Sequence, residues 1–154
     1  MFNLRFKCTV ISSWHMVLHA VPKANKMIAN KARPGITIAD LQEAAVDYLA
    51  TECLAAGFIE NKEDIINYYF HNISHFIGLD THDPYLSPLK GEYKKVPLEA
   101  GMVISDEPGL YMADRGIGIR IEDDLLITND GCEVLSSKII KEVSDIENAL
   151  ANKR

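Results

Sequence analysis

The N-terminal part of the chain, up to Phe70, repeats its apolar positions every three to four residues, the spacing of an α-helix. A first helix is predicted to end near Arg33, Pro34 and Gly35, where a basic last turn meets two helix breakers. Because Pro22 lacks an N–H and its ring clashes with the preceding turn, we expect this helix to kink or to begin there. The apolar face comprises Trp14, Val17, Leu18, Val21 and Ile28.

A second helix is predicted to begin after Thr37, whose hydroxyl can cap it, with Asp40 three residues further on near the positive end of the helix dipole. Gly57 marks its end, and residues 62–70 have the pattern of a shorter third helix. The apolar face of the second helix comprises Ile38, Leu41, Ala45, Leu49 and Leu54.

From His75 onward the pattern changes to short runs rich in β-branched residues, which predict strands. The runs are HFIGLD, GMVISDE and IGIRIEDDLLIT, and Asn-Asp-Gly at 129–131 is typical of a hairpin turn. Residues 84–96, with two prolines and three lysines, are interpreted as a surface loop over the sheet. Helices followed by a mainly antiparallel sheet define an α+β fold.

The C-terminal segment predicts a short closing helix over residues 144–153, with Ser144 as its cap and with Ile146 and Leu150 facing inward. We expect one domain over the whole chain. Its predicted parts are an unassigned start (1–12), a helical part (13–70), a sheet with the chemical motifs (71–137) and a tail with its helix (138–154).

The chain has 154 residues, 25% of them charged, and a formal net charge of −6. Nucleic-acid binders usually display a basic stripe, so this acidic balance argues against a nucleic-acid partner. Serines and histidines interrupt the apolar character of residues 1–20, and we expect no membrane span. The three cysteines, Cys8, Cys53 and Cys132, lack metal-type spacing, which favours reduced thiols in a cytoplasmic protein.

Apolar and charged side chains alternate over residues 117–124, and a strand points successive side chains to opposite faces. The predicted core face carries Ile117, Ile119 and Ile121, and the other face carries Arg120, Glu122 and Asp124. On that second face the Arg120 guanidinium can orient a nearby carboxylate, although a solvated face with a weak ion pair has the same pattern. Glu107 favours a site, because it ends another predicted strand just before a Pro-Gly turn.

Three histidines, His71, His75 and His82, lie in one short segment upstream of these acids. A single histidine is usually an ordinary surface or core residue, but three of them with two strand-borne glutamates indicate a metal site. Imidazole and carboxylate ligands suit manganese, cobalt, iron or zinc better than copper. A serine nucleophile is not expected, because Ser74 lacks a surrounding glycine elbow.

The motifs HNISHFIGLDTHD (71–83), DEPGLY (106–111) and GIGIRIEDD (116–124) resemble those of the pita-bread metallopeptidases, specifically the aminopeptidase P and prolidase group that acts on Xaa-Pro peptides. The resemblance runs from about Val17 to the C-terminus, and RPGIT at 33–37 matches the start of the family's helix pair. It implies the second half of the family's catalytic domain, a helix pair followed by a curved, mainly antiparallel sheet.

The resemblance also implies roles for single residues. His75, Glu107 and Glu122 correspond to metal ligands, with Glu122 bridging two ions and Glu107 also placed to move a proton from the metal-bound water. In the family two manganese ions, or cobalt or zinc, activate that water and polarise the scissile carbonyl of a proline-containing peptide.

On the substrate side, His71 and His82 correspond to histidines that hold the peptide and stabilise the tetrahedral intermediate. Arg120 and Tyr111 correspond to residues that support the ligands from behind.

This chain departs from the family upstream of the histidine motif. Two aspartate ligands on a family hairpin have no counterpart, and a substrate histidine is missing as well unless His15 or His19 replaces it. The aspartates in this region are Asp40, Asp47 and Asp64. We therefore expect at most one weakly held ion in this chain, which resembles the second half of a catalytic domain alone.

Two functions remain open. The first is an Xaa-Pro metallo-aminopeptidase half that works only with a complementary N-terminal half, or as a homodimer that covers its exposed sheet edge. The second is a catalytically inactive fragment or relative that binds peptides or proteins through the same fold.

Overall fold

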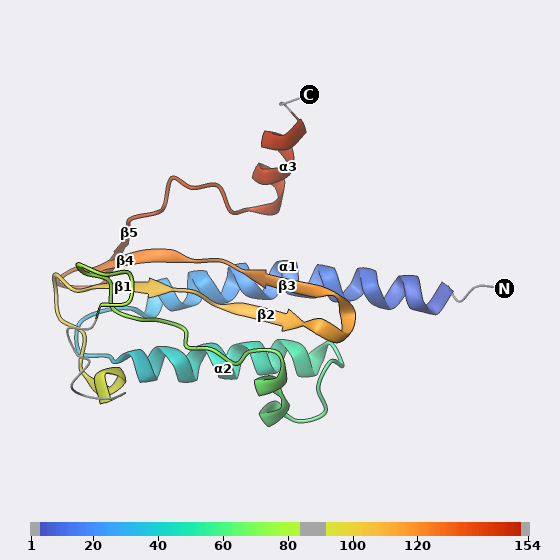
Figure 1. Ribbon diagram of the computed structural model, residues 1–154, viewed down its shortest axis with the longest axis horizontal. Helices are drawn as coiled ribbons and strands as arrows, with labels where there is room; N and C mark the ends of the chain where they lie inside the picture. Colours follow the sequence, from blue (N-terminus) through green and yellow to red (C-terminus); the bar gives the residue numbers. More distant parts are fainter. Residues whose placement is uncertain (1–3, 84–91, 152–154) are drawn as a thin grey trace.

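Two long helices precede the strands, which lie along them in the computed structural model (Figure 1). The structure describes residues 4–83 and 92–151. Helix α1 spans Leu4–Lys31, helix α2 spans Ile38–Ala55, and the two helices pack against each other. No described helix combines the length and the apolar character that a membrane span requires.

Helix α1 runs through Pro22 without interruption, from Leu4 to Lys31. Our expectation that the helix begins at Pro22 is therefore wrong, whereas its predicted end just before Arg33 is confirmed. The buried face on both sides of the proline comprises Val17, Ala20, Val21, Ala24 and Ile28. Packing of this face stabilises the helix across the one hydrogen bond that the proline cannot donate.

Helix α2 begins at the predicted cap. The Asp40 N–H donates to the Thr37 hydroxyl at 3.1 Å, and the Thr37 N–H donates to the Asp40 carboxylate at 2.8 Å, which is a capping box. The predicted apolar face is confirmed except at Leu54, which is 40% exposed because Cys53 takes the buried position. The predicted third helix is a 3-10 helix, η1, over Lys62–Asn67.

The five strands of the described residues pair only in the antiparallel sense, as predicted. One sheet has the order β1-β4-β5, with β1 at Val103–Asp106, β4 at Asp123–Ile127 and β5 at Cys132–Val134. The other pairs β2, Gly109–Met112, with β3, Ile117–Arg120. The turn between β4 and β5 contains the Asn-Asp-Gly sequence that predicted a hairpin.

The two sheets are parts of one long hairpin with a bend in it. Asp106 faces Asp123 on one side of the bend and Gly109 faces Arg120 on the other, and every pair keeps the same register. The predicted strand over residues 117–127 is therefore two strands, β3 and β4, separated at the bend. A 3-10 turn, η4 (Ala113–Arg115), closes the hairpin between β2 and β3.

The predicted faces of this hairpin are confirmed by burial. Ile117 is buried and Ile119 and Ile121 pack against the core, whereas Arg120, Glu122 and Asp124 are exposed. The core face continues along β4 with Leu125 and Ile127 and along β1 with Ile104. Helix α1 contacts β1, β2, β3 and β5, so the core lies between this helix and the bent sheet.

The HFIGLD run does not form the predicted strand. A single bridge joins Phe76 to Ile104, after which the chain bends and the Asp83 N–H returns to the Phe76 carbonyl at 3.0 Å. The segment nevertheless stays hydrogen-bonded to β1, since the Ile77 N–H donates to the Val103 carbonyl at 3.0 Å. Of the predicted loop over 84–96, residues 84–91 lie outside the described residues, and a 3-10 helix, η3, follows at Glu92–Lys95.

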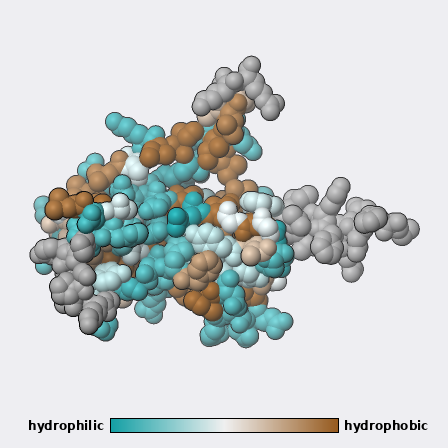
Figure 2. Space-filling model, in the orientation of Figure 1, coloured by the Kyte–Doolittle hydropathy of each residue, from teal (hydrophilic) through white to brown (hydrophobic). Residues whose placement is uncertain are grey.

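Helix α3, Val143–Ala151, stands away from the body of the molecule (Figure 1). The prediction that Ile146 and Leu150 face inward is wrong, because these side chains are 40% and 63% exposed. Ser144 lies inside the helix rather than at its cap, because the helix begins at Val143. Figure 2 shows apolar atoms along this C-terminal arm, to which Leu135, Ile139 and Ile140 also contribute.

Candidate metal centre

Two glutamates face each other where the long hairpin bends. Glu107 directly follows β1 and Glu122 directly precedes β4, so the constant register places them opposite each other. Their sequence neighbours Asp106 and Asp123 are buried on the core face. Because side chains alternate along a strand, the two glutamates project from the other face.

His75 reaches the glutamates from a segment that runs beside β1. The Ser105 N–H donates to the His75 carbonyl at 2.9 Å, and the Glu107 N–H donates to the Ile73 carbonyl at 2.9 Å. In return the His75 N–H donates to the Ser105 hydroxyl at 2.9 Å, and that hydroxyl donates to Glu107 Oε1 at 3.3 Å. Ser105 therefore ties the histidine backbone to the glutamate side chain.

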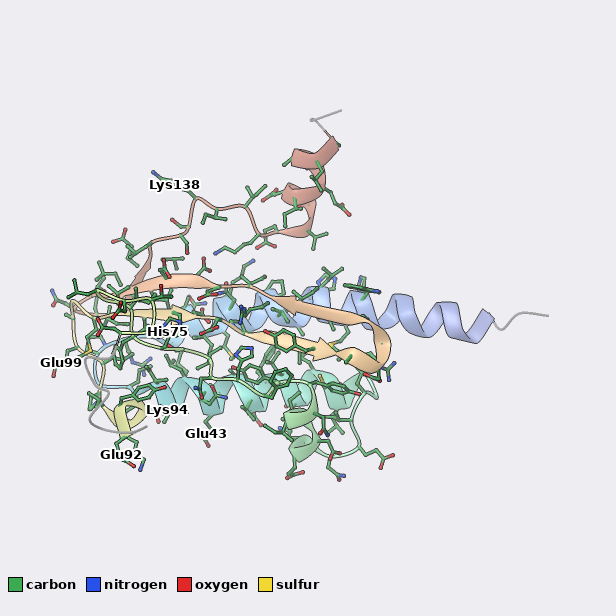
Figure 3. All side chains as sticks on the ribbon, in the orientation of Figure 1. Glu43, His75, Glu92, Lys94, Glu99 and Lys138 are labelled. Carbon is green, nitrogen blue, oxygen red and sulfur yellow. The ribbon has the colours of Figure 1, made fainter. Side chains whose placement is uncertain are left out.

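The ligand-type atoms of these three residues converge. His75 Nε2 lies 3.4 Å from Glu107 Oε1 and 4.0 Å from Glu122 Oε1. Each of the three residues offers one ligand atom to a group whose members all lie within 4.8 Å of one another. Figure 3 shows His75 among side chains that come from several elements of the fold.

The hydrogen bond on the other side of the ring fixes which nitrogen of His75 faces the glutamates. His75 Nδ1 lies 3.1 Å from the Phe76 carbonyl oxygen, which can only accept, so in the neutral ring Nδ1 carries the proton and Nε2 keeps its lone pair. Three lone-pair donors aimed at one point fit a divalent cation. A histidine that donates its other N–H to a backbone carbonyl is also the usual form of a metal ligand.

Arg120 lies against the first of the two glutamates. Its Nη1 is 3.5 Å from Glu107 Oε2, and the Glu107 side chain is only 12% exposed, whereas that of Glu122 is 42% exposed. The two oxygens of Glu107 thus have different partners, the Arg120 guanidinium near Oε2 and the Ser105 hydroxyl, which donates to Oε1 at 3.3 Å. This arrangement holds the carboxylate in a fixed orientation.

His71 and Tyr111 form a second contact beside this group. The Tyr111 hydroxyl is 3.0 Å from His71 Nε2, and His71 Nδ1 is 2.7 Å from the Asn72 carbonyl oxygen. In the tautomer that the carbonyl favours, Nδ1 carries the proton and the tyrosine hydroxyl donates to Nε2. Gly109 lies close to this tyrosine, because a Cβ there would be 2.7 Å from the hydroxyl oxygen.

The structure brings all seven residues singled out in the sequence into one region. The ring of His82 is exposed and its centroid is 4.2 Å from that of His75. A pocket of about 280 Å³ is lined by His71, Asn72, Ser74, His75, His82, Tyr93, Glu107 and Arg120. Sequence reasoning missed Asn72 and Tyr93, and the Lys94 ammonium that donates to Asn72 at 2.7 Å. Tyr93 and Lys94 lie outside the motifs, and Asn72 was passed over within the histidine motif because its amide is not a typical ligand.

The buried acids behind the glutamates are a further feature that the sequence analysis did not predict. The Asp123 carboxylate is paired with Lys141 and accepts from the Ser136 hydroxyl, and Asn25 donates to Asp106 at 3.2 Å. Burial raises the pKa of Asp106 to about 9, and the neighbouring Asp123 charge adds to the effect. Burial also acts to raise the pKa of Asp123, but the hydrogen bonds from Lys141 and Ser136 outweigh it and lower that pKa.

The three aspartates upstream of the histidine motif are engaged elsewhere. Asp40 is in the cap of α2, Asp47 pairs with Lys62 at 2.6 Å, and the Asp64 carboxylate accepts from the Asn61 N–H at 3.0 Å. Within the described residues, none of these aspartates joins His75 and the two glutamates.

A helix pair and a bent antiparallel sheet thus bring together one imidazole and two carboxylates, the side-chain types that bind divalent ions. The chain matches metallopeptidase family M24 over residues 8–129, and it belongs to this family. The Xaa-Pro aminopeptidase of Haemophilus influenzae is 32% identical in an alignment of length 149 that covers 87% of this chain and 34% of the relative. The Xaa-Pro aminopeptidase of Escherichia coli is 35% identical in an alignment of length 130 that covers 75% of this chain and 29% of the relative.

Solved structures show the same fold. A putative aminopeptidase P from Bacillus anthracis has a TM-score of 0.81 at 46% identity, and the match covers 89% of this chain and 31% of the Bacillus anthracis chain. Zinc-substituted Escherichia coli aminopeptidase P in complex with product has a TM-score of 0.81 at 30% identity, covering 90% and 34%. The predicted pita-bread fold is confirmed, and the chain spans about a third of the length of the relatives it matches.

Proposed function

We propose that this chain supplies one half of the metal site of an Xaa-Pro aminopeptidase, with His75, Glu107 and Glu122 as the ligands of one divalent ion. The convergence of these three groups carries the proposal, because His75 Nε2 keeps its lone pair and points at two carboxylates. Sequence similarity to Xaa-Pro aminopeptidases supports the choice of substrate, a peptide whose second residue is proline.

A divalent ion held there supplies a Lewis acid for the peptide carbonyl and lowers the pKa of a bound water. The protein's own contribution is to place the groups around the reacting bond. Glu107, oriented by Arg120, is placed to accept a proton from the attacking water and to pass it to the leaving amine. His71 and His82 line the same pocket and are placed to bind the peptide carbonyl. Tyr111 orients His71 through its hydroxyl.

The complete dinuclear site requires further ligands. Since no other described acid joins the three residues, we propose that the chain alone holds one ion weakly. The two aspartates would come from a complementary N-terminal half of the same fold, because a second copy of this chain lacks them as well. A protein that retains the pocket but lacks these aspartates would bind peptides without cleaving them, which is the second candidate function.

The ligand assignment is tested by titrating the purified chain with Mn²⁺ and comparing His75→Ala, Glu107→Gln and Glu122→Gln with the wild type. Removing a residue that merely orients a ligand lowers metal affinity about 10- to 100-fold, so removing a ligand should cost at least about tenfold. Asp124→Asn is the matched control, because this exposed acid is on the same face as Glu122 but outside the group. Equal affinities in the wild type and Glu107→Gln would disprove the assignment.

The activity is tested by mixing the chain with the upstream part of a related aminopeptidase P and measuring release of the first residue from an Xaa-Pro tripeptide in the presence of Mn²⁺. We expect cleavage in the mixture and none with Glu107→Gln. Binding of the tripeptide without cleavage, with the same metal and partner present, would favour the peptide-binding function instead.

A further inference from the structure

His15 and His19 form an exposed pair on helix α1, four residues apart and hence on the same face of the helix. Their Nε2 atoms lie 3.3 Å apart, and their ring centroids lie 4.4 Å apart at an interplanar angle of 65°. The two rings therefore turn the same nitrogen toward a common point instead of pointing apart into solvent.

The distance between these nitrogens matches the geometry of a chelated ion. Zinc binds histidine nitrogen at about 2.0–2.1 Å with tetrahedral angles, which places two ligand nitrogens about 3.3–3.4 Å apart. The observed 3.3 Å equals this spacing, so an ion can replace the hydrogen bond between the two rings without a change in the distance between the nitrogens. Two histidines spaced i, i+4 on one helix face are also the recurrent arrangement by which helices bind zinc.

We propose that His15 and His19 form a second metal site, on the surface of α1, for a divalent ion that prefers imidazole: Zn²⁺, Ni²⁺ or Cu²⁺. This site is chemically distinct from the group at His75, in which two carboxylates favour harder ions such as Mn²⁺. The two sites share no lining residue among those described.

The surroundings of the pair provide space for an ion and its waters. A pocket of about 450 Å³ is lined by His15, Leu18, His19, Pro22, Lys23, Lys26, Glu142, Val143 and Ser144. Lys26 pairs with Glu142 at 2.6 Å, so its charge is balanced and Lys23 is the cation that opposes a bound metal ion. Glu142 is engaged by Lys26, so water completes the coordination of an ion held by the two exposed histidines.

The test uses the chain without a histidine tag and with His75→Ala, which removes the other candidate site from the titration. We expect this chain to bind one equivalent of Zn²⁺ or Ni²⁺ and to bind Mn²⁺ far more weakly. Adding His15→Gln or His19→Gln should lower the Zn²⁺ affinity at least about tenfold, since each change removes a ligand. Adding Glu43→Gln instead should not change it, because this exposed acid on α2 lies outside both candidate sites.

Two further measurements separate chelation from a hydrogen bond between the two rings. Binding to the folded chain must raise its melting temperature with Zn²⁺, and this rise must vanish in the His15→Gln, His19→Gln double variant. The ring ¹⁵N signals of both histidines should shift at their Nε2 atoms on adding Zn²⁺. Zn²⁺ binding that survives the double variant, or rings that do not respond to Zn²⁺, would overturn the proposal whatever the outcome at His75.

Discussion

Asp106 on β1 and Asp123 on β4 are direct partners across the antiparallel pair, and both are buried. Each directly adjoins one of the two glutamates of the candidate metal centre, which face the other way. A buried aspartate pair thus lies behind the glutamate pair, at the same bend of the sheet. The fold holds four carboxyl groups at one point and needs positive charge to balance those that are ionised.

Lys141 provides this balance, so its removal should destabilise the fold. It pairs with Asp123, whose side chain is only 4% exposed, from the segment that precedes α3. Breaking a buried ion pair costs about 3–5 kcal/mol, and breaking an exposed one costs less than about 1 kcal/mol. Because Lys141 is partly exposed, its pair with Asp123 falls between these limits. Lys141→Met should therefore lower the free energy of unfolding by about 2 kcal/mol. Urea unfolding followed by circular dichroism measures this change.

Lys138→Met is the matched control, because this lysine lies three residues earlier in the same arm and points into solvent (Figure 3). Its replacement should change the free energy of unfolding by less than about 0.5 kcal/mol. Equal effects of the two variants would show that the pair with Asp123 contributes no specific stability.

A side chain at Gly109 should lower the stability of the fold, because Tyr111 occupies the space that this side chain would need. A Cβ at Gly109 would lie 2.7 Å from the tyrosine hydroxyl oxygen, whereas a Cβ at Gly118, on the facing strand, would lie 3.5 Å from the ring, an ordinary contact. Gly109→Ala must displace the ring and break the bond to His71, and overpacking of this kind costs about 1–3 kcal/mol. Gly118→Ala should cost less.

The two alanine variants are compared by thermal unfolding and by the ring ¹⁵N signals of His71. Loss of the tyrosine hydrogen bond should shift the His71 Nε2 signal in Gly109→Ala alone. A Gly109→Ala protein with wild-type stability and an unchanged His71 signal would show that Tyr111 can move aside without cost.

Sequence alone predicted the parts of the fold that local periodicity determines. The cap at Thr37 and the alternation around Arg120 were correct because each depends on neighbouring residues and on one backbone geometry. Helix α3 was predicted to face inward because its apolar spacing is helical. Periodicity identifies such a face but does not say what covers it, and here Ile146 and Leu150 remain exposed.

The candidate metal centre could be predicted in its residues but not in its geometry. Motifs pointed to His75, Glu107 and Glu122, yet only the register shows that the two glutamates are cross-strand partners. The pairing of Lys141 with Asp123 could not be predicted, because the two residues are far apart in sequence and a lone lysine in a tail has no pattern. Long-range partners of this kind depend on tertiary packing.

The cap of α2 should make the free energy of unfolding depend on pH in acid, because the pKa of Asp40 in the folded state lies below the usual aspartate value. Side-chain and backbone hydrogen bonds from Thr37 lower the pKa of Asp40 from 3.8. A lowered pKa in the folded state means that the ionised carboxylate stabilises the fold above pH 3.8, and that this contribution is lost as the pH falls through the folded value. The advantage of the wild type over Asp40→Asn in urea unfolding should therefore be constant near neutral pH and shrink below about pH 4.

Glu43→Gln serves as the control for general effects of acid on the helix, because this exposed glutamate lies in the same helix outside the cap (Figure 3). An advantage of the wild type over Asp40→Asn that stays the same from pH 7 to pH 3 would show that the cap does not depend on the charge of Asp40.

Pro22 should cost stability, since α1 continues on both sides of it. An interior proline removes one backbone hydrogen bond and strains the preceding turn, and costs up to about 3 kcal/mol relative to alanine. The Pro22 ring also lines pockets beside Leu18 and Val143. Replacing the proline would lose these contacts, which offsets part of the stability gained from the restored hydrogen bond. Pro22→Ala should therefore raise the free energy of unfolding by about 1–3 kcal/mol, and Lys23→Ala, at the adjacent exposed position, by much less. A Pro22→Ala protein that is less stable than the wild type would mean that the ring contacts, or a bend that the proline imposes on the helix, outweigh the missing hydrogen bond.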